Sequence, residues 1–85
     1  MGINARPRSQ RTLAQARERE LMMAREAIAM VASGASPRVV LAGIRFGDVI
    51  LGAARRLALE SGVRVKPIWR DEGDGADLVI EPVYD

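Results

Sequence analysis

The chain has 85 residues, a net charge of +2, and neither cysteine nor histidine. Disulfide bonds, the usual zinc sites, a Ser-His-Asp triad and a Cys-His pair are therefore excluded. The length predicts a single domain. Because no apolar stretch approaches the roughly 20 residues of a membrane span, and no signal-peptide core is present, we expect a cytoplasmic protein.

The charge is distributed unevenly along the chain. Residues 1–60 contain ten arginines and five acidic residues, whereas residues 61–85 contain three basic and six acidic residues. This polarity is typical of a protein with a nucleic-acid-binding face or an acidic partner.

The first eleven residues have almost nothing to bury. They hold Arg6, Arg8 and Arg11 around Pro7, and this composition predicts a flexible basic arm over residues 1–11. The single α/β domain is then expected to cover residues 12–85.

A long amphipathic helix is predicted over residues 12–33. Thr12 and Gln15 form a capping-box pattern at its start, and Ser33-Gly34 is a good stop. Apolar residues recur near helical spacing between these signals. The other face alternates arginines with glutamates, which indicates a solvated surface with ion pairs one turn apart. These charged residues are Arg17, Glu18, Arg19, Glu20, Arg25 and Glu26.

The stretch 38–42 decides between two folds. It is short, β-branched and bounded by Pro37 and Gly43, and its near-continuous apolar character favours a buried strand. If Ser36-Pro37 instead began a short helix, the chain would have three helices and a hairpin, the outline of a winged helix. The acidic hairpin tip at residues 71–77 argues against a DNA-binding wing.

The next segment is a glycine-flanked loop, Gly43-Ile-Arg-Phe-Gly47, that leads into a second helix over residues 48–61. Free backbone N–H groups at a helix start favour anions, and Arg45 adds a bidentate phosphate donor, although Asp48 at the cap competes for the same N–H groups. The spacing matches neither a Walker A motif nor G-x-G-x-x-G. An ordinary tight loop therefore remains the alternative interpretation.

Two more strands, 63–70 and 77–83, complete the predicted fold. We expect an α-β-α-β-β domain of two layers, with a mixed three-stranded sheet whose first two strands are parallel neighbours through a right-handed crossover. Both helices would cover one face and leave Arg64, Lys66 and Arg70 on the other. Pro67 and Pro82 each indicate an edge position or a bulge.

The stretch from Ser33 to Asp48, with the following helix and residues 63–65, resembles the Alba family of small nucleic-acid-binding proteins. It is also similar to the C-terminal domain of translation initiation factor three. The resemblance implies a dimer whose loop meets DNA or RNA backbone, with Arg45 as the phosphate contact and Gly43 and Gly47 shaping the loop.

The leading functional hypothesis is a small nucleoid- or RNA-associated protein without enzymatic activity, cofactor, metal or catalytic residues. It would contact phosphates through Arg6, Arg8, Arg11, Arg45, Arg55 and Arg56. A second hypothesis is an adaptor or regulatory subunit that docks a protein partner through the acidic hairpin or through Gly52 and Leu59, which share the far side of the second helix. Packing of these two residues against the first helix is the alternative. A winged-helix DNA-binding regulator is the third hypothesis. A homodimer is expected because one sheet face is left uncovered.

Overall fold

The computed structural model has two helices and three strands in the predicted order. The elements are α1 (Ala5–Ala32), β1 (Val39–Ile44), α2 (Gly47–Ser61), β2 (Val63–Trp69) and β3 (Ala76–Pro82). The structure describes residues 5–71, 73 and 75–83. Because Val39–Ile44 is a strand, the α-β-α-β-β prediction is confirmed and the winged-helix alternative is wrong.

The sheet is antiparallel, and the predicted mixed sheet is wrong. Its order is β1-β3-β2, so β3 lies between the two strands that were expected to pair directly. β1 and β2 still run in the same direction, but both are edge strands. The central strand β3 is buried on both faces, since Leu78, Val79 and Ile80 are all buried. The edge strand β1 is not, since its Val40 is 49% exposed. A continuous buried run is what a central strand requires.

The two prolines occupy different places in the sheet. Pro67 lies on edge strand β2, as its missing N–H predicts, but Pro82 is the last residue of the central strand. The end of a strand tolerates proline for the same reason as an edge does, because no ladder hydrogen bond is lost.

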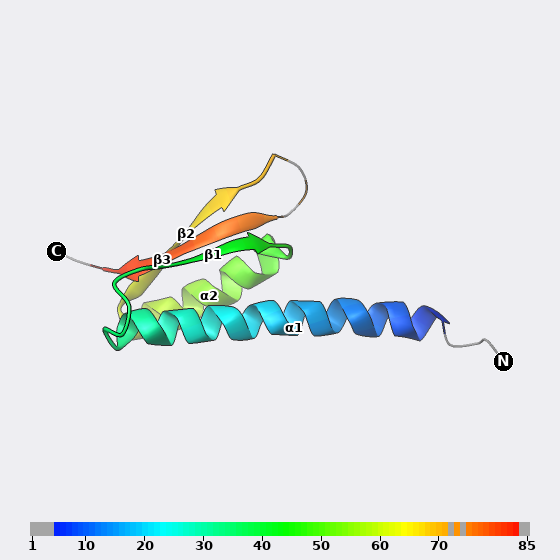
Figure 1. The fold of residues 1–85 in the computed structure, drawn as a ribbon, viewed down its shortest axis with the longest axis horizontal. Coiled ribbons are helices and arrows are strands. Elements are labelled where there is room, and N and C mark those ends of the chain that lie inside the picture. Colours follow the sequence, from blue (N-terminus) through cyan, green and yellow to red (C-terminus); the bar gives the residue numbers. More distant parts are fainter. Residues whose placement is uncertain (1–4, 72, 74, 84–85) are drawn as a thin grey trace.

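Both helices cover one face of the sheet and leave the other face open (Figure 1). The core between these layers is small and aliphatic, and its fully buried large side chains are Ile44, Ile50, Leu78 and Ile80. Ala24 of α1 and Ala54 of α2 are both completely buried, and such short side chains let the helices lie close to each other and to the sheet.

Helix α1 is much longer than the sheet that it covers. Its 28 residues span about 42 Å at 1.5 Å per residue, about twice the length of a strand of seven residues. The N-terminal half therefore extends beyond the rest of the domain (Figure 1). The helix begins at Ala5 rather than at residue 12, so residues 5–11 of the predicted arm lie within it, while residues 1–4 lie outside the described residues. Pro7 is tolerated there because it falls in the first helical turn.

Candidate nucleic-acid interface

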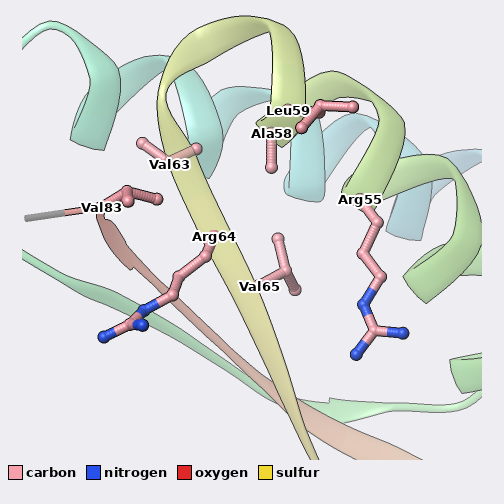
Figure 2. A pocket seen from close by; sticks show the side chains of 7 residues that line it. All are labelled: Arg55, Ala58, Leu59, Val63, Arg64, Val65 and Val83. Carbon is pink, nitrogen blue, oxygen red and sulfur yellow. The ribbon is translucent and has the colours of Figure 1, made fainter.

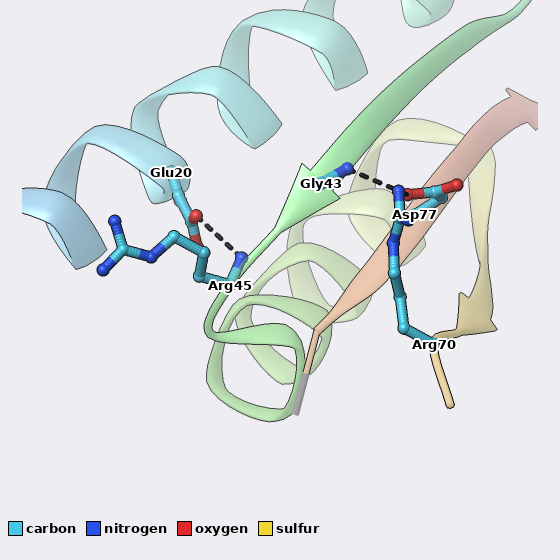
Figure 3. A network of polar contacts seen from close by, with 5 residues as sticks. All are labelled: Glu20, Gly43, Arg45, Arg70 and Asp77. Carbon is cyan, nitrogen blue, oxygen red and sulfur yellow. Dashed lines mark hydrogen bonds and ion pairs between the residues drawn. The ribbon is translucent and has the colours of Figure 1, made fainter. Parts of the chain in front are cut away.

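The loop between β1 and α2 begins at a bulge in β1. The pairing with β3 shifts by one residue between Leu41 and Ile44, and Gly43 has a φ of +73°, in the left-handed region that favours glycine. The Gly43 N–H donates to Asp77 Oδ1 at 2.8 Å (Figure 3). Gly47 needs no such freedom, because it is the buried first residue of α2 and its φ is not positive.

Asp77 fastens this bulge to the hairpin. The same carboxylate oxygen accepts a hydrogen bond from Arg70 Nη2 at 2.8 Å. The Gly43 N–H, followed by the Arg70 guanidinium, holds the pKa of Asp77 below its ordinary value of 3.8, because both interactions favour the charged carboxylate.

A buried carboxylate closes the other end of the loop. Glu20 of α1 is only 8% exposed, and its Oε2 accepts the N–H of Arg45 at 2.8 Å (Figure 3). Its other oxygen, Oε1, accepts the N–H of Phe46 at 3.0 Å. Phe46 is the N-cap residue of α2 and forms no side-chain cap hydrogen bond. Glu20 therefore caps α2 from the neighbouring helix. Asp48, which the sequence placed at the cap, lies in the first turn instead.

This arrangement corrects the sequence prediction for the loop. The backbone N–H groups of Gly43, Arg45 and Phe46 do not await an external anion, because Asp77 and Glu20 already accept their hydrogen bonds. A phosphate cradle built from these three N–H groups is thus excluded, and the basic side chain that the loop presents is the exposed Arg45.

Glu20 was assigned from the sequence to the solvated face of α1, and that assignment is wrong. Its position relative to Ala24 and Ile28, four and eight residues later, puts it in line with the buried stripe of the helix. A single acid inside an apolar stripe is the signal that could have identified it. Within residues 12–32, moreover, no ion pair joins the arginines and glutamates of α1, so that predicted pairing is absent from this stretch.

Two guanidinium groups converge on the ring of Phe46. The Cζ atom of Arg45 lies 5.8 Å from the ring centroid, and that of Arg17 lies 5.9 Å from it, both within the range of a cation–π interaction. Both arginines are exposed, and neither forms an ion pair with a carboxylate in the described part of the chain. Arg17 was not among the predicted contacts, because only the fold brings α1 beside this loop.

The remaining predicted contacts lie elsewhere. Arg55 and Arg56 are exposed on α2, and Arg55 lines a groove beside β2 (Figure 2). The side chains of Arg6, Arg8 and Arg11 lie outside the described residues, although the backbone of all three belongs to α1. The structure therefore groups Arg45 with Arg17 and not with Arg55.

The open sheet face carries the expected basic residues, and each of them is paired with a carboxylate. Arg64 Nε and Lys66 Nζ lie 2.9 and 3.2 Å from Glu81 Oε2, and Arg70 is paired with Asp77. The hydrogen bonds from Lys66 and then Arg64 lower the pKa of Glu81 below its ordinary value of 4.5, against the opposing effect of desolvation. On this face three basic side chains thus share two carboxylates, whereas Arg17 and Arg45 are paired with no described carboxylate.

The predicted partner face is free of the first helix. Leu59 is 84% exposed, and a Cβ added at Gly52 would have no atom within 4 Å outside its own helix. The alternative that these residues pack against α1 is therefore wrong. Leu59 and Arg55 instead form one wall of a groove of about 380 Å³ whose other wall is the start of β2 (Figure 2).

The described residues contain neither a metal site nor a membrane-spanning helix. Among them, no group of three or more acidic side chains is placed to hold a metal ion. In the same part of the chain, no helix combines the length and the apolar character that crossing a membrane requires. Comparison with models of known protein families, with curated proteins and with solved structures gives no match.

Proposed function

We propose that this protein is a non-enzymatic nucleic-acid-binding protein that contacts the phosphate backbone through the N-terminal half of α1 and the Arg17–Arg45 pair. The proposal keeps the function expected from the sequence but changes the residues that are central to phosphate contact. Arg45 acts through its side chain alone, and Arg17 joins it from the neighbouring helix.

The observation that carries the proposal is the Arg17–Arg45 pair at the base of the extended helix. Two exposed guanidiniums, 5.8 and 5.9 Å from one aromatic ring, form no ion pair with a described carboxylate. Both cations lie beside the same ring without a described carboxylate partner, and guanidiniums bind phosphate oxygens bidentately.

The composition of the extended half supports the same surface. Residues 5–19 contain five arginines and a single glutamate, so a strongly positive helix leads directly to the Arg17–Arg45 pair. A charged rod about 20 Å long can follow several phosphates of a nucleic-acid backbone. Such contacts give affinity without reading base sequence, so we expect DNA and RNA duplexes to bind with similar strength.

The test is fluorescence anisotropy with a labelled duplex at a series of salt concentrations. The double variant R17A/R45A should bind more weakly, and its slope of log K against log[salt] should be smaller by about 1.8, the value for two phosphate contacts. R38A is the matched control, because Arg38 is exposed but precedes β1, at the opposite end of that strand from Arg45. The proposal fails if the wild type has no affinity at low salt, or if R38A changes the slope as much as one of the paired arginines.

A further inference from the structure

The free edge of β2 presents unused hydrogen-bonding groups. Gly62 O accepts the Val83 N–H at 3.2 Å, and Gly75 O accepts the Arg70 N–H at 3.0 Å. In an antiparallel ladder the residues of one strand alternate between bonding to the partner strand and pointing away from it. Since positions 62 and 70 bond to β3 or its extensions, positions 63, 65, 67 and 69 direct their backbone groups outward. Only Pro67 lacks an N–H among these four.

The flank of α2 beside this edge continues the same surface. Asp48, Gly52, Arg55 and Leu59 follow one another at helical spacing on this flank, and all four are exposed. Arg55 and Leu59 meet Val63 and Val65 across the groove (Figure 2). Because Gly52 has no side chain, another helix can approach α2 closely at the middle of the flank.

The two ends of the edge have complementary character. At the Val63 end, the groove of about 380 Å³ has apolar walls and Arg55 at its rim. At the Trp69 end, a second hollow of about 240 Å³ is lined by Ile68, Trp69, Arg70, Asp71 and Asp77. There Arg70 is already paired with Asp77, so Asp71 leaves this end acidic.

We propose that a second copy of this chain docks along this edge, with the two β2 strands antiparallel about a two-fold axis. An antiparallel arrangement places the acidic Trp69 end of each copy against the basic Val63 end of the other. The register that pairs all outward-pointing residues puts Trp69 opposite Val63 of the second copy, with both side chains on the helix side of the sheet. Trp69, 46% exposed in one chain, then lies in the groove over Leu59.

The outward position of Pro67 is compatible with this pairing. In the same register Pro67 faces Val65 of the second copy, so its carbonyl accepts a hydrogen bond and only the missing N–H is lost. Each unlike contact is made twice, as a two-fold interface requires. The inference does not depend on nucleic-acid binding, because the Arg17–Arg45 pair lies outside this edge.

The first test is sedimentation of the nucleic-acid-free full chain over a concentration series. The wild type should reach twice the 9.2 kDa mass of one chain, and L59R should weaken association at least tenfold. V40R is the matched control, because Val40 is an exposed apolar residue on the open sheet face, and this variant should associate like the wild type. Leu59 is too exposed for its replacement to disturb the core.

A cysteine provides a second test that does not rely on loss of association. In the proposed register Lys66 lies on the two-fold axis, opposite itself, at a non-hydrogen-bonded position where side chains are about 4.5–5.5 Å apart. Because the chain has no cysteine of its own, K66C should form an interchain disulfide under mild oxidation, and V40C should not.

Three outcomes overturn the proposal. The wild type could remain a monomer up to millimolar concentration, as it would if the groove served another protein. Association could be abolished by V40R and not by L59R, which would place the interface on the open sheet face. Finally, K66C could fail to cross-link while L59R still separates the copies, which would exclude the antiparallel strand pairing.

Discussion

Replacement of Glu20 should destabilise the protein far more than replacement of any other glutamate on α1. Its carboxylate is buried and accepts two backbone N–H groups at the start of α2. Glu20→Gln keeps the size of the side chain but offers one oxygen in place of two and removes the charge. Glu20→Ala removes both acceptors.

The magnitude follows from the number of donors left without a partner. A hydrogen bond to a charged group contributes about 1.5–3 kcal/mol, and an unpaired buried donor costs about 1–3 kcal/mol. Glu20→Gln should therefore lower the free energy of unfolding by about 2 kcal/mol, and Glu20→Ala by about 3–5 kcal/mol. A domain of this length has a stability of only about 4–13 kcal/mol, so the alanine variant approaches the limit of folding.

Urea denaturation followed by circular dichroism measures this loss. With a slope of about 1 kcal/mol/M, Glu20→Gln should lower the midpoint by about 2 M. Glu18→Gln is the matched control, because Glu18 is exposed two residues earlier on the same helix, and it should change stability by no more than about 0.5 kcal/mol. Sulfate should also stabilise Glu20→Ala more than the control, because an anion can replace the lost carboxylate at the helix start. Equal midpoints for the two glutamine variants would refute the capping role of Glu20.

Three further predictions concern stability. Gly62 ends α2 with a φ of +73°, so Gly62→Ala should cost about 1–2 kcal/mol in urea denaturation, and an unchanged midpoint would contradict the left-handed cap. The lowered pKa of Asp77 means that its stabilising effect is complete above its ordinary value of 3.8 and is lost as the pH falls through the lower folded value. Asp77→Asn should therefore flatten the loss of stability below about pH 4, measured from urea midpoints across that range, and an unchanged acid slope would refute the assignment. Ala54 is fully buried, so Ala54→Leu should overpack the core and lower the free energy of unfolding by about 1–3 kcal/mol; a thermal midpoint equal to the wild type would show unfilled space there.

The elements themselves could be predicted because local chemistry determines them. Gly34 and Gly62 follow the two helices, and both have the positive φ that ends a helix. The apolar run before Gly43 was assigned correctly to a strand. The predicted start of α1 at residue 12 was wrong because a capping-box pattern does not by itself end a helix on its N-terminal side. The helix continues through residues 5–11, so it needs no cap at Thr12.

The strand order could not be obtained from the same patterns. A hairpin strand can pair on either side of its neighbour, and the spacing of residues along the chain is identical in both cases. The decision depends on which strand can be buried on both faces. Val79 of β3 is 5% exposed even though it lies on the open face, between Val40 and Lys66. Once the structure is known, burial on both faces identifies β3 as the central strand. The sequence does not make this distinction, because the stretch 39–42 is as apolar as the buried part of β3.

The candidate site was predicted in part for a related reason. The glycine-flanked loop and its exposed Arg45 follow from sequence, since both are local features. The carboxylate that occupies the loop comes from Glu20, 25 residues earlier, and the second guanidinium comes from Arg17. Contacts of such long range depend on how α1 crosses the start of α2, which no local pattern specifies.

The length of α1 has a consequence for how the domain opens locally. Residues 12–19 are helical but nearly all exposed, so little besides their own backbone hydrogen bonds maintains them, and short unsupported helices are marginal in water. Amide hydrogen exchange should therefore be fast in this stretch and slow towards Val31, where the helix lies on the core. A bound polyanion would slow exchange in the first stretch and leave the second unchanged. The exchange rates along α1 would then show which residues of the helix contact the polyanion.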